Sequence, residues 1–571
     1  MIKEEIEKLL RKALGELGFK IENILLEHPE NPEHGDYATS VAFVLAKQEK
    51  KNPQEIAEEI VSKLKIENSK FLENAEAKSG FVNFFVTKEY LLKELSEIAE
   101  KDDYGKNQSF KGKKIMVEYA HPNTHKEMHI GHMRTLITGE SLARIFDASG
   151  AKVFRANYQG DIGPHVAKAI WGTEKLLQER NMKWEEAESL TPGEKAHLLG
   201  EGYVKGNEQY ESNEDEIDAL NIKLYEKNKD VMDVYERTRS WSLGYYDELY
   251  KRFDTKFDKL YFESEMAAPG KKIVEEHIGK VFEKSEGAII FDGEKHGLHK
   301  RVFITKYGIP TYEGKEMGLA PQQYKDFPFD LNVHVVANEQ AGYFQVVFKA
   351  LEVIDKKFKG RELHLSMGMV NLVGTKMSSR RGVVITVDGL LGEVRGLLQE
   401  LITSKELSDE ERKDVEEIGT MAAVKYSVLK IDPKSNVMFD MEKSVSLGGN
   451  SGPYIQYTYA RCRSILRKSQ VSSFNFQNKY TDFLKEEMDI LRLAYRFPEI
   501  VEEAAEKYSP SIICSYVFDL AQKYNAFYNS HRVLEAETKE AREFRLLLTA
   551  ATARLIQNSL SLLGIKTLEK M

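Results

Sequence analysis

The sequence has 571 residues, of which 42% are hydrophobic and 30% are charged, and its formal net charge at pH 7 is −9. A chain of this length is too long for one hydrophobic core and predicts several domains. The net negative charge excludes a protein that coats nucleic acid indiscriminately, because such binding neutralises many phosphates at once. No apolar run reaches the roughly 18 residues of a membrane span, so we expect a cytoplasmic protein with no membrane partner.

Residues 1–108 predict a small α+β domain. Two helices separated by a loop precede a hairpin-like stretch around Gly80. The segment at 101–107 is polar and contains glycine, which is typical of a linker. We therefore expect a domain boundary near residue 108.

Residues 109–388 predict a Rossmann-type parallel sheet. A buried-strand run at 115–120 is followed by a helix at 131–146 with an apolar stripe, and then by a second strand at 153–157. Strand, helix and strand in this order form a parallel crossover unit. The predicted fold class is therefore α/β.

A charged, mostly helical insertion at about 165–300 divides the predicted sheet. Further strands of this sheet are expected at 302–305, 333–337 and 363–366. Residues 389–571 predict an all-α domain that follows the sheet.

The two cysteines, Cys462 and Cys514, form no C-x-x-C motif. This spacing argues against a metal or redox site built on cysteine. We expect reduced, structural thiols and no protein-bound structural metal.

An H-x-G-H motif begins at His129, where the first predicted strand leads into its helix. Ligands of open α/β sheets bind at such positions. Gly131 allows a nucleotide to approach the backbone, and the free N–H groups of a helix start favour phosphate. Taken alone, the motif fits better a helix cap that has one histidine packed inward.

A second motif begins at Lys376 and continues through Met377 and Ser378, just after the last predicted strand. Its cations can close over the β- and γ-phosphates of ATP and stabilise the charge on departing pyrophosphate. Both motifs in this order on one split sheet predict an enzyme that joins a carboxylic acid to the α-phosphate of ATP.

The two motifs resemble the signature sequences of class I aminoacyl-tRNA synthetases, and the sequence around them is similar to arginyl-tRNA synthetases. Similar stretches lie at 117–134 and 155–163. Residues 34–40 resemble the N-terminal tRNA-binding domain of that family, and residues 452–461 resemble the start of its helical anticodon-binding domain. The similarity spans nearly the whole chain.

This resemblance implies the following site residues. The catalytic residues are His129, His132, Lys126 and Lys376. The ATP-binding residues are Gly131, His129, His132, Met369, Val370, Lys376, Met377 and Ser378. The arginine-binding residues are Glu118, Asn123, Tyr312, Glu316 and Gln340. The tRNA-binding residues are Tyr454, Tyr457, Arg461, Tyr524, Tyr528 and Met571. The expected partners are L-arginine, ATP with Mg²⁺ and tRNA(Arg), bound by a monomer.

The residue types suit this assignment. A planar guanidinium offers five donors, so carboxylates and a phenol are suitable partners. A carboxylate such as Glu118 within an apolar strand is costly unless it is paired.

Some positions depart from the family pattern. Lys315 and Glu316 replace the usual Arg-Asp pair, and Ser379 replaces the second lysine of the K-M-S-K-S motif. Lys126, just before H-x-G-H, fills the place of that lysine in relatives that lack it. Two alternatives stay open: a class I enzyme for lysine, cysteine or glutamine, and an inactive relative that only binds tRNA. A small-molecule nucleotidyltransferase also uses H-x-G-H, but it would not need the terminal helical domain.

Overall fold

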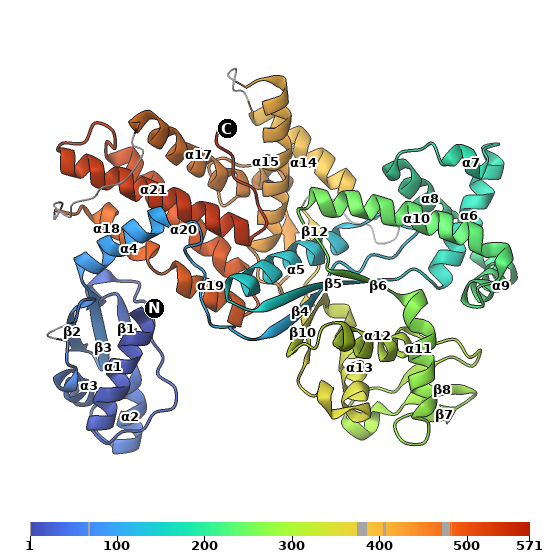
Figure 1. The fold of residues 1–571 in the computed structure, drawn as a ribbon, viewed down its shortest axis with the longest axis horizontal. Coiled ribbons are helices and arrows are strands. Elements are labelled where there is room, and N and C mark those ends of the chain that lie inside the picture. The colour runs from blue at the N-terminus through green and yellow to red at the C-terminus, as the bar shows by residue number, and fades with distance from the viewer. Residues whose placement is uncertain (1, 67–68, 374–384, 403–406, 471–479, 481) are drawn as a thin grey trace.

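The computed structural model describes residues 2–66, 69–373, 385–402, 407–470, 480 and 482–571. A central parallel sheet lies between a helical insertion on one side and the C-terminal helices on the other, and the N-terminal domain lies below those helices (Figure 1). Within the described ranges, no helix is long and apolar enough to cross a membrane.

The N-terminal domain is α+β, as predicted. Its antiparallel sheet has the order β1-β3-β2 and is covered by three helices. Helix α1 buries one stripe of apolar side chains, which is the helical periodicity of an amphipathic segment. The elements are α1 (Ile2–Glu16), β1 (Tyr37–Thr39), α2 (Val41–Glu49), α3 (Pro53–Lys63), β2 (Leu72–Lys78) and β3 (Phe81–Val86).

The main sheet has five parallel strands in the order β11-β10-β4-β5-β6. The strands are β4 (Lys114–Glu118), β5 (Lys152–Gln159), β6 (Lys259–Phe262), β10 (Leu331–Ala337) and β11 (Glu362–Met367). The chain leaves β4 toward β5 on one side and later returns to β10 on the other. The carboxyl ends of β4 and β10 therefore form the switch point at which such sheets bind ligands.

Three helices pack close to this switch point: α5 (Ile130–Ala148), α12 (Tyr312–Asp326) and α13 (Ala341–Ile354). Helix α5 is buried along almost its whole length. A helix that is apolar on most sides belongs in the interior of a large protein. The residues that precede it are consequently held in the middle of the molecule.

The predicted insertion consists of two parts, because β6 returns to the main sheet between them. The first part is helical and contains α6 (Pro164–Glu179), α7 (Trp184–Ala187), α8 (Pro192–Glu208), α9 (Glu214–Tyr225) and α10 (Lys229–Arg252). The second contains α11 (Glu263–Glu276) and an antiparallel sheet of β7 (Glu283–Ser285), β8 (Ala288–Phe291) and β9 (Arg301–Ile304).

The assignment of 302–305 to the main sheet was wrong, because these residues lie at or next to β9 of the small sheet. Strand β6 was missed because it has only four residues, one of which is Lys259. So short a run lacks the pattern by which a buried strand is distinguished from other structure.

Where the structure describes it, the C-terminal part is helical apart from β13 (Val437–Phe439), which pairs in parallel with β12 (Val370–Leu372). Its helices are α14 (Val387–Leu401), α15 (Asp409–Leu429), α16 (Met441–Ser444), α17 (Gly452–Ser469), α18 (Lys485–Ala494), α19 (Phe497–Glu506), α20 (Ser511–Ser530) and α21 (Lys539–Leu562). Helix α4 (Lys88–Glu100), which follows the N-terminal domain, packs against α21 and α18.

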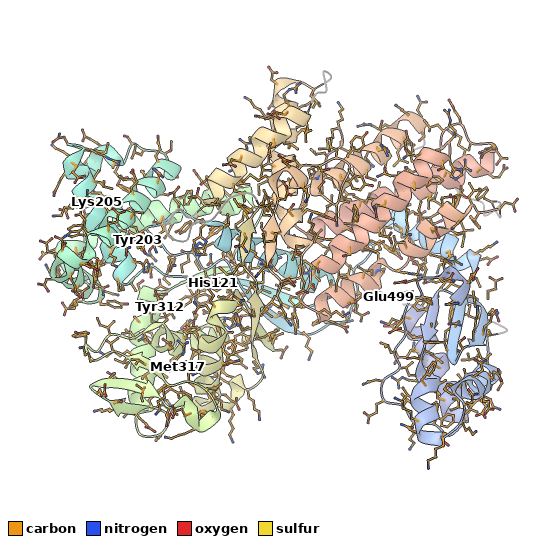
Figure 2. The ribbon with its side chains drawn as sticks, turned by 180° about the vertical axis from the view of Figure 1, so that it is seen from behind. His121, Tyr203, Lys205, Tyr312, Met317 and Glu499 are labelled. Carbon is orange, nitrogen blue, oxygen red and sulfur yellow. The ribbon has the colours of Figure 1, made fainter. Side chains whose placement is uncertain are left out.

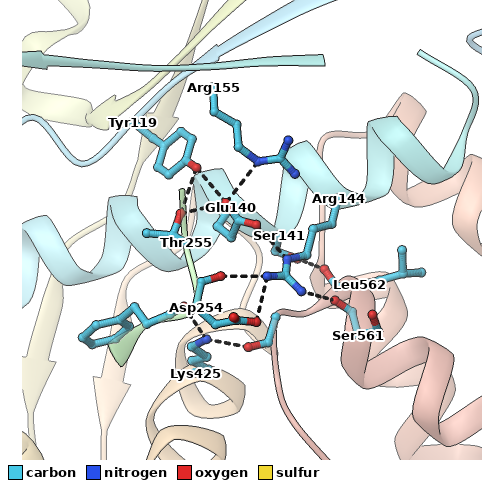
Figure 3. Close-up of polar contacts among 12 residues, drawn as sticks. Tyr119, Glu140, Ser141, Arg144, Arg155, Asp254, Thr255, Lys425, Ser561 and Leu562 are labelled. Atoms are coloured by element: carbon cyan, nitrogen blue, oxygen red, sulfur yellow. Dashed lines mark hydrogen bonds and ion pairs between the residues drawn. The ribbon is translucent and has the colours of Figure 1, made fainter. Parts of the chain in front are cut away.

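A polar cluster joins the main sheet to the C-terminal helices (Figure 3). Arg144 on α5 donates to the Ser561 carbonyl oxygen over 3.1 Å and to Glu140 over 2.7 Å. Lys425 on α15 is buried, and its ammonium group donates to the carbonyl oxygens of Phe253 (2.7 Å) and Gly564 (2.5 Å). Three segments far apart in sequence therefore meet around one lysine.

Candidate active site

The loop between β4 and α5 has an unusual backbone. Ala120, His121 and His125 have positive φ angles of 79°, 50° and 64°. Such conformations of non-glycine residues cost about 1–3 kcal/mol each and persist only where the surrounding structure holds them. Helix α10 helps to hold this backbone in place through two of its residues. The buried His125 ring lies 2.8 Å from the Thr238 hydroxyl, and the Tyr246 hydroxyl donates to the Lys126 carbonyl over 2.8 Å.

His129 is the N-cap of α5. Its Nδ1 accepts hydrogen bonds from the backbone N–H groups of Gly131 (3.0 Å) and His132 (3.4 Å). Because Nδ1 is the acceptor, the ring proton lies on Nε2 and can be donated to a ligand. The His129 and His132 rings stack with centroids 3.7 Å apart.

Gly131 is required by this stacking arrangement. A Cβ atom at position 131 would lie 2.8 Å from Cε1 of His129. The glycine therefore leaves space for the capping imidazole, a role that the sequence motif alone did not indicate.

Both imidazoles are neutral near pH 7. Burial lowers the pKa of His129 and that of His132 below the usual value, and the positive charge of Lys126 adds to the effect. Within the described part of the chain, the buried Nδ1 of His132 has no hydrogen-bond partner. A buried polar atom without a partner is costly, so this atom fits a site that a ligand completes.

The predicted Lys376, Met377 and Ser378 lie outside the described residues. The described chain resumes at Ile385, whose carbonyl accepts from Ile130 N–H over 3.3 Å, and Val387 N–H donates to the Met128 carbonyl over 2.9 Å. The chain thus returns beside the histidine pair.

Met369 and Val370 lie just past β11. The Met369 carbonyl accepts from Arg134 of α5 over 2.9 Å, and Val370 is buried in β12. Met369 is exposed, so it is accessible to a nucleotide bound at the start of α5.

Glu118 is buried at the carboxyl end of β4 and already has partners. Its Oε1 lies 3.0 Å from His334 Nδ1, and Gln323 donates to its Oε2. Burial acts to raise the pKa of this carboxyl, but His334 outweighs burial and holds the pKa well below its usual range. His334 in turn lies between Glu118 and Glu362. Burial acts to lower the pKa of its imidazole, but the two carboxylates outweigh burial and raise this pKa well above the usual value.

Glu316 is the second buried acid of the site. It is buried, and its Oε1 accepts a hydrogen bond from the Tyr343 hydroxyl over 3.0 Å. Burial, with the negative charge of Glu118, raises the pKa of Glu316 to about 8. A cation that arrives at this carboxyl reverses the second effect and offsets the first.

The other predicted arginine-binding residues occupy the rim. Tyr312 begins α12 and is 53% exposed, and its ring centroid lies 5.1 Å from the Lys315 ammonium group. That ammonium forms a buried ion pair with Glu263 over 2.5 Å. Gln340 is exposed at the end of β10, and Asn123 is half-buried and bridges to Gly160 beside β5. Figure 2 shows Tyr312 and Tyr203 on different lobes, with His121 near the end of the sheet.

Two partners of the acids, His334 and Tyr343, were missed from the sequence. His334 lies directly opposite Glu118 in the parallel register of β10 and β4. The available signal was a histidine within one apolar strand and a glutamate within another. It could be interpreted only once the pairing of these strands was known.

Four of the tRNA candidates gather in one surface pocket of about 800 Å³, which is lined in part by Tyr457, Arg461, Tyr528 and Met571. The Arg461 guanidinium lies 4.9 Å from the ring centroids of both tyrosines. Arginine between aromatic rings is a surface on which unstacked bases can lie.

The other two candidates are less accessible. The Tyr454 hydroxyl accepts from Asn525 over 3.0 Å and is half-buried. Tyr524 is fully buried and donates to Thr549 Oγ1 over 3.0 Å. The expectation that Tyr524 contacts tRNA is therefore corrected: its ring packs in the helical core.

Comparison with known families covers almost the whole chain. The model of the class I tRNA synthetase (R) catalytic domain matches residues 94–441. The model of the arginyl tRNA synthetase N terminal domain matches residues 2–86, and that of the DALR anticodon binding domain matches residues 455–571. The chain belongs to the arginyl-tRNA synthetase family.

Individual relatives agree with this membership. The arginine–tRNA ligases of Parabacteroides distasonis and Treponema denticola are each 31% identical and align with 94% and 96% of this chain and with 94% and 95% of their own lengths. The arginyl-tRNA synthetase structures from Thermus thermophilus and Plasmodium falciparum superpose with TM-scores of 0.84 and 0.80 at 24% and 21% identity. Each covers 100% of this chain, with 100% and 99% of the other chain aligned, which confirms the shared fold.

Proposed function

We propose that the chain activates arginine at the switch point of the sheet and transfers it to tRNA(Arg). Membership of the arginyl-tRNA synthetase family makes it a class I, ATP-dependent arginine–tRNA ligase. The observation that carries the site assignment is that the neutral histidine pair opens the helix that follows β4, while Glu118 at the end of β4 acts on the second buried acid, Glu316. Phosphate and guanidinium sites thus lie at neighbouring strand ends.

In the first step, the arginine carboxylate attacks the α-phosphate of ATP, which enters as its magnesium complex. Arginyl-adenylate forms and pyrophosphate leaves. His129 and His132 donate hydrogen bonds to the phosphates, while Lys126 and Lys376 stabilise the charge that develops on them. The enzyme contributes positioning and electrostatic stabilisation, because the attacking carboxylate is ionised and needs no general base.

Arginine specificity comes from the acids. Glu316 binds the guanidinium with Glu118 beneath it, and Tyr312 covers it from the rim, with Asn123 and Gln340 nearby. A site built on buried hydrogen bonds rejects analogues that cannot make them.

In the second step, the terminal ribose hydroxyl of tRNA attacks the activated carbonyl, which yields arginyl-tRNA and AMP. The pocket around Arg461 receives anticodon bases, and Tyr454 supports it from α17. We place this reaction in the cytoplasm and assign it to a monomer, since one chain supplies both sites.

The decisive experiment is aminoacylation of total tRNA with labelled arginine, run beside lysine, cysteine and glutamine. Arginine alone is expected to be charged. Charging of another amino acid would overturn the specificity, and the absence of charging with tRNA still bound would identify an inactive relative.

Two variants locate the reaction. His132→Ala is expected to lose at least about a hundredfold in rate, in the range found when one transition-state donor is removed. His299→Ala, which changes an exposed histidine between β8 and β9, is its matched control and should retain most activity. Equal losses in both would remove the histidine pair from the mechanism.

A further inference from the structure

Lys126 is held in an unusual way. Its ammonium group lies 3.6 Å from the centroid of the Tyr203 ring, on helix α8 of the insertion. Within the described ranges no carboxylate forms an ion pair with it. We propose that Tyr203 is a positioning residue that keeps the Lys126 ammonium in front of the histidine pair, ready for the phosphates of ATP. This inference rests on the proposed role of Lys126.

The location of Lys126 supports this role. Its charge contributes to the lowered pKa values of His129, His132 and His165. The ammonium group is therefore close to all three imidazoles, and it is half-buried. An aromatic face attracts such a cation through the ring quadrupole without neutralising its charge. A carboxylate partner would instead compete with the phosphate that Lys126 has to bind.

Helix α8 is a rigid support for this ring. A Cβ atom at Gly172 would lie 1.9 Å from the Gly202 carbonyl oxygen, and a Cβ atom at Gly206 would lie 2.1 Å from the Lys168 carbonyl oxygen. Helices α6 and α8 therefore touch backbone to backbone. Only four residues separate the end of β5 from the start of α6, so the position of Tyr203 is tied to the sheet.

A second contact from the same helix holds the neighbouring residue. His197 Nδ1 lies 3.3 Å from Glu127 Oε2. The backbone of Lys126 is fixed by the hydrogen bond that the Tyr246 hydroxyl donates to its carbonyl oxygen. The insertion thus fixes both the backbone and the charged end of this lysine. Tyr203 also lies close enough to Tyr312 to contribute to the raised pKa of the Tyr312 hydroxyl.

The test compares substitutions at position 203 in the full-length enzyme. Tyr203→Phe keeps the aromatic face and is expected to stay within about twofold of the wild type. Tyr203→Leu is expected to lower kcat/KM for ATP by about tenfold, within the range of a partly desolvated cation–π contact. The KM for arginine should change much less, and a larger effect on arginine would show that Tyr203 acts through Tyr312 instead.

Tyr210→Leu is the matched control, because Lys168 lies 4.0 Å from the Tyr210 centroid in the same insertion but away from the histidine pair. Its kinetics should match the wild type. A series of increasingly fluorinated phenylalanines at position 203 separates charge from shape, since fluorine weakens the quadrupole with little change in volume. The logarithm of kcat/KM for ATP should fall steadily along the series, and a flat series would refute the proposal.

The Lys126→Met variant separates the proposed role of Lys126 from the proposed role of Tyr203. If this variant keeps full activity, the proposed role of Lys126 is wrong. If it is impaired, Tyr203→Leu should have no further effect in the Lys126→Met background, because the two residues act through one contact. Additive effects in this double-mutant cycle would reject Tyr203 as the positioning residue while leaving the role of Lys126 in place.

Discussion

At the scale of the residue, the proposed role of Glu316 predicts that arginine binding depends on pH. With a pKa raised to about 8, this carboxyl is mostly protonated at pH 7 in the free enzyme. In the proposed site arginine binds the ionised form, so below pH 8 each binding event has to release a proton. The KM for arginine should therefore rise about tenfold per unit as the pH falls from 8 to 6, and it should level off above 8.

Steady-state kinetics over this pH range, with the KM for ATP as internal reference, tests the prediction. Glu316→Gln should raise the KM for arginine and remove its dependence on pH. A slope that survives in this variant would assign the proton to another group. Calorimetry in buffers of different ionisation enthalpy gives an independent count of the protons released.

At the scale of the element, Lys425 links stability to pH. Burial, with help from the charge of Arg144, lowers the pKa of this lysine from 10.5 to about 7. Between these values the unfolded chain binds a proton that the folded chain does not. Stability from this group therefore rises as the pH increases from about 7 toward 10.5, by about 1.4 kcal/mol per pH unit, and is lost as the pH falls back toward 7.

The measurement is the free energy of unfolding by denaturant for the wild type and for Lys425→Met. The difference between them should change by about 1.4 kcal/mol per unit between pH 7.5 and 9.5. Lys272→Met, which alters an exposed side chain on α11, provides the control and should give a constant difference. A constant difference for Lys425→Met as well would show that the buried amine keeps its proton.

The helices and strands also show which parts of the fold can be predicted from sequence patterns. The first crossover unit and the helix that begins at Ile130 follow from apolar periodicity, and the histidine motif follows from its place between strand and helix. Strand β6 and the pairing of Glu118 with His334 do not, since both depend on which strands become neighbours. The burial of Tyr524 was equally hidden, because a tyrosine in an amphipathic helix suits the core and the surface alike.

At the scale of the whole molecule, tRNA has to span distant parts of one chain. The N-terminal domain is fixed to α19 by the Tyr37 hydroxyl, which donates to Glu499 over 2.5 Å, and to α18 by the Asp36–Arg492 ion pair of 3.0 Å. The domain expected to bind tRNA is thereby held against the C-terminal helical part, in which α17 and α20 line the Arg461 pocket, with Glu499 on the far side from Tyr203 (Figure 2).

Arg461→Met tests this arrangement. Loss of the guanidinium between the two tyrosine rings should raise the Kd for tRNA by about tenfold and leave the Kd for ATP unchanged, as expected for one base-stacking and cationic contact. Filter binding at a fixed salt concentration measures both constants. Arg180→Met, which breaks an exposed ion pair with Glu201 on the insertion, is the control, and an equal loss of tRNA binding there would indicate a nonspecific charge effect.

The split sheet has a consequence for synthesis on the ribosome. Glu118 and His334 are 216 residues apart in the chain, yet their strands are adjacent. At about 5–20 residues per second, β4 emerges roughly 10 to 40 s before β10 can cover its open edge. Nascent chains therefore carry an apolar strand with one unpaired edge during that interval, and chaperones that shield such edges should influence the yield of this enzyme more than its final activity.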